Sequence, residues 1–270
     1  MERYRYITFL TDFGLQDDFV GVCHGVIARI APDARVIDVT HGIPPHAVQQ
    51  GAVVLANALN YLPVAVHLAV VDPGVGTERR AIAVSTNDGR TLVGPDNGLL
   101  TIAGERCGID AAHELTETRY HLGSVSRTFH ARDVFAPVAA HIASGVALAD
   151  LGPPVEPARL VRIHIPEPEA RRGHVSATVI AVDRFGNITL NLQATQLDGE
   201  LQPGERVEVR LHLNAYFALV AETFADAPPG ELIVYEDAYG FVSIALSNGN
   251  AAGLTGARPG AVIRIVPARE

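Results

Sequence analysis

The chain has 270 residues, of which 48% are hydrophobic and 19% charged, a composition typical of a globular protein with a large buried core. Thirty acidic against twenty-one basic residues give a formal net charge of −9, so we expect no binding to a nucleic acid backbone. No uncharged apolar run reaches about 18 residues, so we expect no membrane span.

Strand-like and helix-like runs alternate through the first half of the chain. We expect strands at residues 7–10, 36–39 and 64–71, and helices at 19–30, 47–59 and 134–147. Residues 81–85 and 91–93 have the pattern of a hairpin around Asn87-Asp88-Gly89. This alternation predicts an α/β domain in which a mostly parallel sheet carries helices on both faces.

A proline-rich segment over residues 152–172 marks the expected domain boundary. We therefore assign an N-terminal α/β domain to residues 1–165 and a smaller domain to residues 166–270. The second domain has short β-like runs separated by turn residues, at 175–182, 205–213, 232–235, 242–246 and 261–266. Several short strands at this spacing predict a small C-terminal β-barrel or sandwich.

Two cysteines, Cys23 and Cys107, cannot form a disulfide framework, and no apolar secretory segment follows the first residues. We therefore expect a reduced, cytoplasmic protein. The eleven histidines show neither HExxH nor another metal-ligand spacing, so we expect no metal site.

Three polar clusters follow the predicted strands of the first domain, where ligands of open α/β sheets bind. Asp12, in Thr11-Asp12-Phe13-Gly14, could accept hydrogen bonds from ribose hydroxyls, or could cap a turn. Asp72 and Arg79 flank a glycine loop that matches neither a P-loop nor GxGxxG. They could face each other, as functional groups or as a structural salt bridge. His130 precedes a predicted helix and is either a proton-handling group or a surface or capping residue.

Two further clusters lie in the second domain. In Asp183-Arg184-Phe185-Gly186-Asn187, an aromatic ring and an amide could stack on a purine and bond its edge, or form a turn around a buried phenylalanine. Ser247 begins a run of small polar residues that could contact a small ligand or could end a strand in an ordinary turn.

Together these clusters resemble the S-adenosylmethionine (SAM) hydroxide adenosyltransferases, the adenosyl-forming SAM hydrolases, which are related to the SAM-dependent fluorinase and chlorinase. The resemblance covers nearly the whole chain. Its motifs are Thr11-Asp12-Phe13-Gly14, Val39-Thr40-His41, the run from Val71 to Arg80, the run from Gly94 to Leu100, Phe129-His130-Ala131-Arg132-Asp133 and Asp183-Arg184-Phe185-Gly186-Asn187.

The resemblance implies hydrolysis of SAM to adenosine and L-methionine, with no cofactor. It implies a homotrimer that binds SAM where one subunit's N-terminal domain meets its neighbour's C-terminal domain. The family's water-handling Asp-Arg-His set matches Asp72, Arg79 and His130. Asp12 would bind the ribose hydroxyls, Phe13 and Phe185 would pack near the nucleoside, and Asn187 would contact the adenine. Asp183 and Ser247 would hold the amino-acid end of methionine.

Two alternatives stay open. A halide-using adenosyltransferase is disfavoured because the halogenases have a tyrosine at the position of Asp72 and a serine at that of Ala131, and because the fluorinase insertion after the glycine loop is absent. A non-catalytic nucleoside-binding protein is disfavoured by the complete Asp-Arg-His set. One departure from the family pattern is Ala131, which replaces a glycine common after the histidine.

Overall fold

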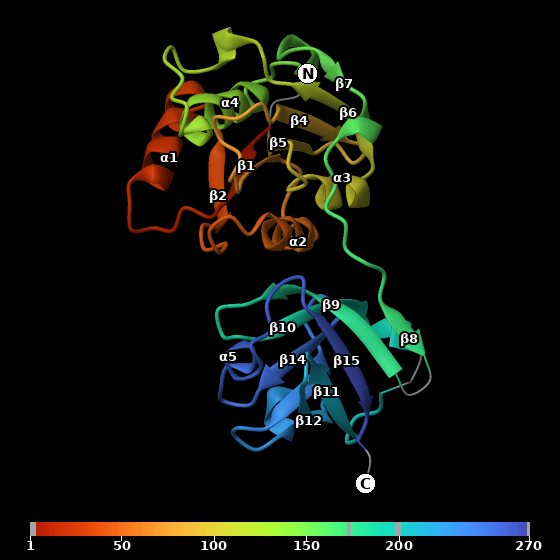
Figure 1. The fold of residues 1–270 in the computed structure, drawn as a ribbon. Coiled ribbons are helices and arrows are strands. Elements are labelled where there is room, and N and C mark those ends of the chain that lie inside the picture. The colour runs from red at the N-terminus through yellow and green to blue at the C-terminus, as the bar shows by residue number, and fades with distance from the viewer. Residues whose placement is uncertain (1–3, 172–173, 198–200, 269–270) are drawn as a thin grey trace. The chain divides into compact units, whose positions relative to one another are not determined.

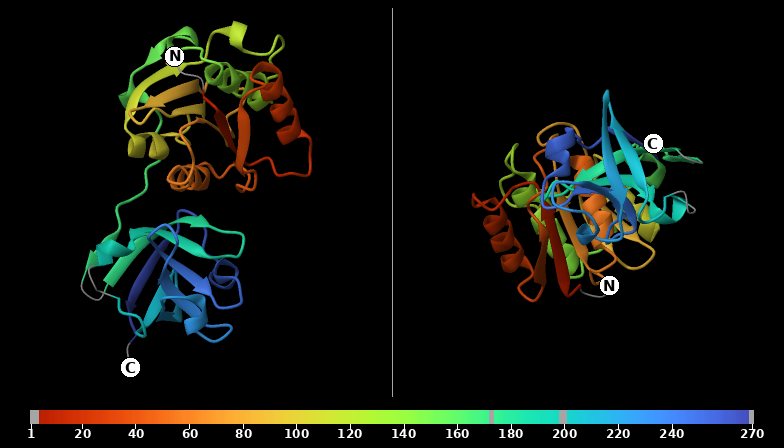
Figure 2. Two further views of the ribbon diagram at one scale, coloured as in Figure 1. Left: turned by 180° about the vertical axis from the view of Figure 1, so that it is seen from behind. Right: turned by 90° about the horizontal axis from the view of Figure 1, so that it is seen from below.

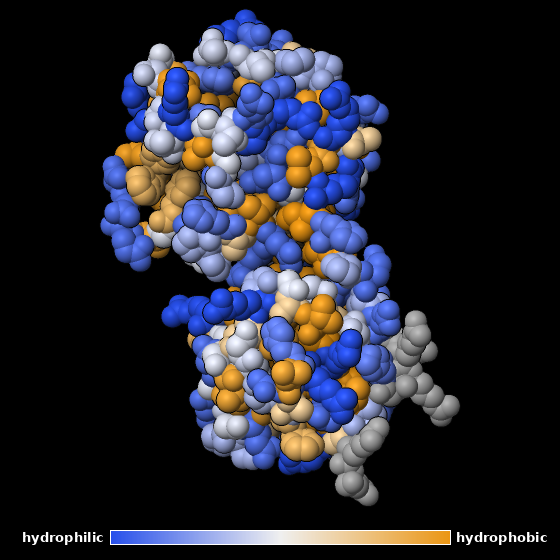
Figure 3. Space-filling view, in the orientation of Figure 1, coloured by the Kyte–Doolittle hydropathy of each residue, from blue (hydrophilic) through white to orange (hydrophobic). Residues whose placement is uncertain are grey.

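A computed structural model describes residues 4–171, 174–197 and 201–268, and divides the chain into two compact units, Met1–Ile163 and His164–Glu270 (Figure 1). Each unit has its own hydrophobic core. In the space-filling view, polar residues cover much of the visible face of each unit, interrupted by small apolar patches (Figure 3). None of the helices in the described part of the chain is long and apolar enough to cross a membrane.

The first unit contains a seven-stranded mixed sheet in the order β2-β1-β3-β5-β4-β6-β7. Strands β2, β1, β3 and β5 are parallel, whereas β4, β6 and β7 add antiparallel pairs at the other side. The strands are β1 (Tyr6–Thr11), β2 (Arg35–Thr40), β3 (Val66–Val70), β4 (Ala81–Thr86), β5 (Thr91–Pro95), β6 (Ile109–Glu114) and β7 (Pro154–Val155). The loops after β1, β2 and β3 therefore leave the same edge of the sheet.

Helices cover both faces of this sheet (Figure 2). The helices are α1 (Phe19–Ile30), α2 (Val48–Ala58), α3 (Thr101–Cys107) and α4 (Ala136–Ala143). Phe9 packs in the core beneath α1 and α4, whereas its neighbour Leu10 packs in the core beneath α2 and α3. All five residues of β3 are buried. The long apolar run that predicted this strand is thus explained, because β3 is covered on both faces.

The second unit is a closed β-barrel of seven strands. An eighth strand, β8 (Glu169–Arg171), pairs with the barrel strand β9. Pairing of β9 with β10 completes a ring that otherwise runs β10-β14-β13-β12-β11-β15-β9. The barrel strands are β9 (His174–Val182), β10 (Ile188–Gln193), β11 (Arg206–Leu211), β12 (Asn214–Val220), β13 (Leu232–Glu236), β14 (Phe241–Leu246) and β15 (Val262–Pro267). A short helix, α5 (Ala251–Thr255), follows β14.

The predicted fold class, α/β with a C-terminal β-barrel, is confirmed, and so is the hairpin of β4 and β5. The sequence interpretation did not include α3, β6, β10 or β12. The helix expected at 134–147 instead begins with a π-turn, η2 (Ala131–Phe135), and ends at Ala143.

Candidate active site

Asp72 and Arg79 form a buried ion pair within the loop that follows β3. Arg79 Nε donates to Asp72 Oδ1 and Oδ2 at 3.0 and 3.1 Å, and Arg79 Nη2 donates to Oδ2 at 2.5 Å. Only 6% of the Asp72 side chain and 10% of the Arg79 side chain are exposed. The pair is therefore well oriented and largely shielded from water, unlike a surface salt bridge.

His130 joins this pair from a segment 51 residues further along the chain. Its Nδ1 lies 2.9 Å from Arg79 Nη2. Because a guanidinium has only donors, His130 Nδ1 is the acceptor, and the neutral imidazole carries its proton on Nε2. Burial, followed by the positive charge of Arg79, lowers the pKa of His130 below its ordinary value, although Asp72 and Asp133 oppose this shift. The three side chains thus form one network with Arg79 at its centre.

The glycine loop is folded tightly against the segment that carries His130. Gly76 has a φ of +78°, and a Cβ at this position would lie 2.5 Å from the carbonyl oxygen of Arg127. Glycine is therefore required here both by the backbone conformation and by the close approach. Thr77 Oγ1 donates to Gly74 O at 2.7 Å and closes the turn. The Arg79 guanidinium lies over the Phe135 ring at 5.1 Å.

Asp133 anchors the polypeptide around His130. Its buried carboxylate accepts hydrogen bonds from the Ser126 backbone N–H at 2.7 Å and from Arg132 Nε at 2.6 Å. These bonds fix both ends of the segment between Ser126 and Asp133. His130 is thereby held at the N-terminal end of η2, facing Arg79.

Asp12 and Phe13 lie in the loop after β1, at the same edge of the sheet as Asp72. Asp12 Oδ2 accepts the backbone N–H of His46 at 2.9 Å. The Phe13 ring contacts the Phe129 ring edge-on, with 5.9 Å between centroids. Phe129 directly precedes His130, so Phe13 is linked by packing to the segment that carries the network.

In the second unit, the predicted residues lie on two neighbouring turns. Asp183 Oδ1 accepts the backbone N–H groups of Phe185 and Asn187 at 2.8 and 2.9 Å, and Oδ2 accepts Asn187 Nδ2 at 2.8 Å. Phe185 is 66% exposed and is not the buried ring of an ordinary turn. Ala252 N–H donates to Gly186 O at 2.9 Å, which joins this turn to the segment that follows Ser247.

Ser247 is buried at the end of β14, and its hydroxyl donates to Ala227 O at 3.0 Å. The hydroxyl oxygen can still accept a hydrogen bond from a ligand. The predicted site residues thus form two groups. In the first unit, Asp72, Arg79 and His130 form one network, and Asp12 and Phe13 lie in a neighbouring loop. In the second unit, Asp183, Phe185 and Asn187 share one turn, and Ser247 lies on the neighbouring one.

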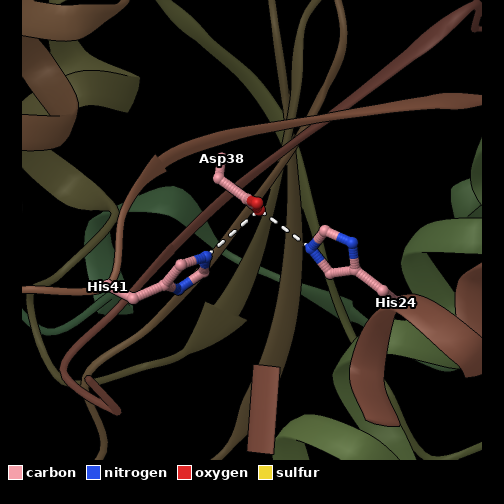
Figure 4. A group of neighbouring side chains, drawn as sticks. All are labelled: His24, Asp38 and His41. Carbon is pink, nitrogen blue, oxygen red and sulfur yellow. Dashed lines mark hydrogen bonds and ion pairs between the residues drawn. The ribbon is translucent and has the colours of Figure 1, made fainter. Parts of the chain in front are cut away.

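A further polar cluster, which the sequence interpretation missed, consists of His24, Asp38 and His41 (Figure 4). The only local sequence signal is the Asp38-x-x-His41 spacing at the end of β2. His24 reaches the cluster from α1, a contact that only the folded chain reveals.

The chain matches two family models that together span most of its length. The model of the SAM hydroxide adenosyltransferase N-terminal domain matches residues 7–152, and that of the C-terminal domain matches residues 177–264. The chain belongs to the SAM hydroxide adenosyltransferase family. The resemblance inferred from the motifs is thereby confirmed.

Named relatives support this membership. An (R)-S-adenosyl-L-methionine hydrolase from Salinispora tropica is 51% identical, over 96% of this chain and 97% of the relative. A protein of the same name from Thermus thermophilus is 38% identical, over 97% of this chain and 100% of the relative. A crystal structure of an uncharacterized conserved protein from Thermotoga maritima is 37% identical, with a TM-score of 0.88 over 96% of this chain and 99% of that one. A fluorinase from an Actinoplanes species is 28% identical, over 88% of this chain and 90% of the relative.

Proposed function

We propose that this protein hydrolyses SAM to adenosine and L-methionine. Water attacks the ribose 5′-carbon in line with the sulfonium, the new C–O bond forms as the C–S bond breaks, and sulfur keeps the bonding electrons. The water gives up one proton. The observation that carries the proposal is the network in which His130 joins the largely buried Asp72–Arg79 pair. Relatives named as SAM hydrolases at 35–51% identity support it.

Asp72 orients the attacking water and accepts its proton, because a carboxylate within hydrogen-bond reach is an effective general base. Arg79 fixes the carboxylate with two-pronged hydrogen bonds and stabilises negative charge as the water gains hydroxide character. His130 presents Nε2–H as a further donor to the water, since its Nδ1 is occupied by Arg79. Holding water and sugar in line supplies a large part of the acceleration.

The reaction needs no cofactor, because a sulfonium is already a good leaving group. For the substrate, we assign the ribose hydroxyls to Asp12, the nucleoside faces to Phe13 and Phe185, and the adenine edge to Asn187. Asp183 and Ser247 bind the amino-acid end of methionine. The 66% exposure of Phe185 supports this assignment. The Arg184 guanidinium lies over this ring at 5.4 Å and would have to move aside, or leave the other face, for a base to stack on it.

We further propose a cytoplasmic homotrimer with its sites at subunit interfaces, as family resemblance suggests. Light scattering coupled to size exclusion should give a mass near three chains. Full activity of a monomer at high dilution would contradict shared sites.

The Asp72→Asn variant tests the proposed chemistry. Loss of the general base should lower the rate of adenosine release by roughly 10²–10⁴-fold, while SAM binding measured by calorimetry stays near that of the wild type. Adenosine is followed by chromatography, and added chloride or fluoride should yield no 5′-halogenated nucleoside.

Asp88→Asn is the matched control, because Asp88 also pairs with an arginine, Arg90, but in the turn of the β4–β5 hairpin. This variant should turn over SAM at close to the wild-type rate. Wild-type turnover by Asp72→Asn would reject the assigned role of Asp72.

A further inference from the structure

The His24, Asp38 and His41 cluster gathers three metal-ligating side chains from separate parts of the first unit (Figure 4). His24 comes from α1, Asp38 from β2 and His41 from the loop after β2. Asp38 Oδ1 lies between the two imidazoles, 2.9 Å from His24 Nε2 and 3.1 Å from His41 Nε2. One ligand atom from each residue lies within 4.8 Å of the others.

His41 is the buried member of the cluster, with 3% of its side chain exposed. Its Nδ1 lies 2.8 Å from Thr11 Oγ1, and its ring packs edge-on against Phe9 with centroids 4.9 Å apart. These contacts fix the ring so that Nε2 faces Asp38. Within the described residues, Nε2 has no hydrogen bond of normal geometry, although Asp38 Oδ1 is near. A buried imidazole nitrogen is thus aimed into the cluster with its lone pair or proton unsatisfied.

We propose that these three residues bind a divalent cation of the zinc type, through His24 Nε2, His41 Nε2 and a carboxylate oxygen of Asp38. Two imidazoles and one carboxylate favour Zn²⁺ over Mg²⁺ and Ca²⁺, which prefer oxygen ligands. This site departs from the expectation, based on histidine spacing, that the protein has no metal site.

The geometry of the cluster is close to what Zn²⁺ requires. In a tetrahedral site with bonds of about 2.1 Å, neighbouring ligand atoms lie roughly 3.4 Å apart. Both nitrogen–oxygen separations are slightly shorter, and all the ligand atoms lie within 4.8 Å of one another, so modest side-chain movements would admit the ion. Asp38 and His24 are 43% and 35% exposed, which provides an entry path and room for a water as fourth ligand.

Thr11 supplies the outer contact that zinc-binding histidines usually have. The Thr11 hydroxyl oxygen would accept the Nδ1–H of His41, leaving the Nε2 lone pair for the metal. Thr11 Oγ1 also accepts the Phe13 backbone N–H at 3.2 Å, and His41 O accepts the Gly14 N–H at 2.8 Å. The cation would therefore lie behind the loop that carries Asp12 and would stabilise it, as a positioning element separate from Asp72.

The test is titration of metal-free protein with Co²⁺ and Zn²⁺. We expect one Co²⁺ per chain, the intense visible absorption of four-coordinate cobalt, displacement by Zn²⁺ and no displacement by Mg²⁺. His24→Asn removes a proposed ligand and should weaken Zn²⁺ binding by more than about 100-fold. This loss is larger than the roughly 10–100-fold typical when a residue that only contacts a ligand is replaced. Thr11→Val, which keeps the side-chain shape, should weaken it by roughly 10–100-fold.

His164→Asn serves as control, because it removes an exposed imidazole from the second unit and should leave Zn²⁺ affinity unchanged. The proposal is overturned if the cobalt absorption does not develop, if it is the same in His24→Asn as in the wild type, or if Mg²⁺ displaces the ion. None of these measurements depends on turnover of SAM, so the result is separate from that of the proposed function.

Discussion

Arg79 is the residue on which the candidate site depends, because it contacts both of the other members. Its guanidinium donates to Asp72 and to His130 Nδ1, and lies over the ring of Phe135. Protonation of His130 would place an N–H at Nδ1 against the guanidinium N–H, with two positive charges in contact. The site therefore keeps His130 neutral and in a single tautomer.

Replacing Arg79 by glutamine should raise the pKa of His130. Arg79 is the second cause, after burial, of its lowered value, while Asp72 and Asp133 act in the opposite direction. Removal of the cation leaves these carboxylates to favour the imidazolium form. The change can be followed by NMR titration of the His130 ring protons in the wild type and in Arg79→Gln. An unchanged or lower pKa in the variant would show that the guanidinium does not set the charge of His130.

Residues close in sequence were easier to place from sequence than distant ones. The seven-residue spacing of Asp72 and Arg79 around a glycine loop allowed a prediction that they face each other, and they do. His130 could be joined to them only through family resemblance, because nothing local links positions 51 residues apart. His24 was missed for the same reason, since its contact with Asp38 depends on how α1 packs on the sheet.

At the level of elements, the site depends on how closely the glycine loop approaches the segment before His130. Gly76→Ala should destabilise the protein by about 2 kcal/mol, from the positive φ and from the contact of a Cβ with Arg127 O at 2.5 Å. Because the loop carries Arg79, adenosine release should fall as well. Urea denaturation and the chromatographic assay measure the two effects.

Gly25→Ala is the matched control for that substitution. Gly25 lies in α1, and a Cβ there would meet no atom within 4 Å. Since alanine favours a helix by up to about 1 kcal/mol over glycine, this variant should be as stable as the wild type or more so. Equal losses of stability in both variants would show that the close approach at Gly76 is not what makes glycine necessary.

Several elements with a strong local pattern were predictable, whereas β6 and β10 were not predicted. The apolar run of β3 and the turn residues of the β4–β5 hairpin are direct signals. By contrast, β6 has the sequence Ile-Asp-Ala-Ala-His-Glu and becomes a strand by pairing with β4. In the barrel, β10 does alternate buried Ile188, Leu190 and Leu192 with polar residues. Its pairing with β9, which closes the ring, is a property of the folded chain alone.

For the whole molecule, the dependence of stability on pH should reflect His67 in the centre of the sheet. His67 lies on β3, is fully buried and places Nδ1 2.8 Å from Thr8 Oγ1. Burial, then the charge of Arg90, lowers its pKa to about 3, with Asp88 opposing the shift. The folded protein therefore holds His67 neutral over a pH range in which the unfolded chain is protonated.

The sign of the effect follows from this difference. As the pH falls below about 6.5, the unfolded state binds a proton at His67 that the folded state does not, so the free energy of unfolding decreases as the pH is lowered. This single group should cost about 2 kcal/mol between pH 7 and pH 5, with further loss until the pH reaches the folded pKa. Urea denaturation at several pH values should show a smaller slope of stability against pH in His67→Gln than in the wild type, whatever the stability of the variant at pH 7. Parallel slopes in the two proteins would mean that His67 can be protonated in the folded state, and that the buried centre of the sheet is more polar than the packing around β3 implies.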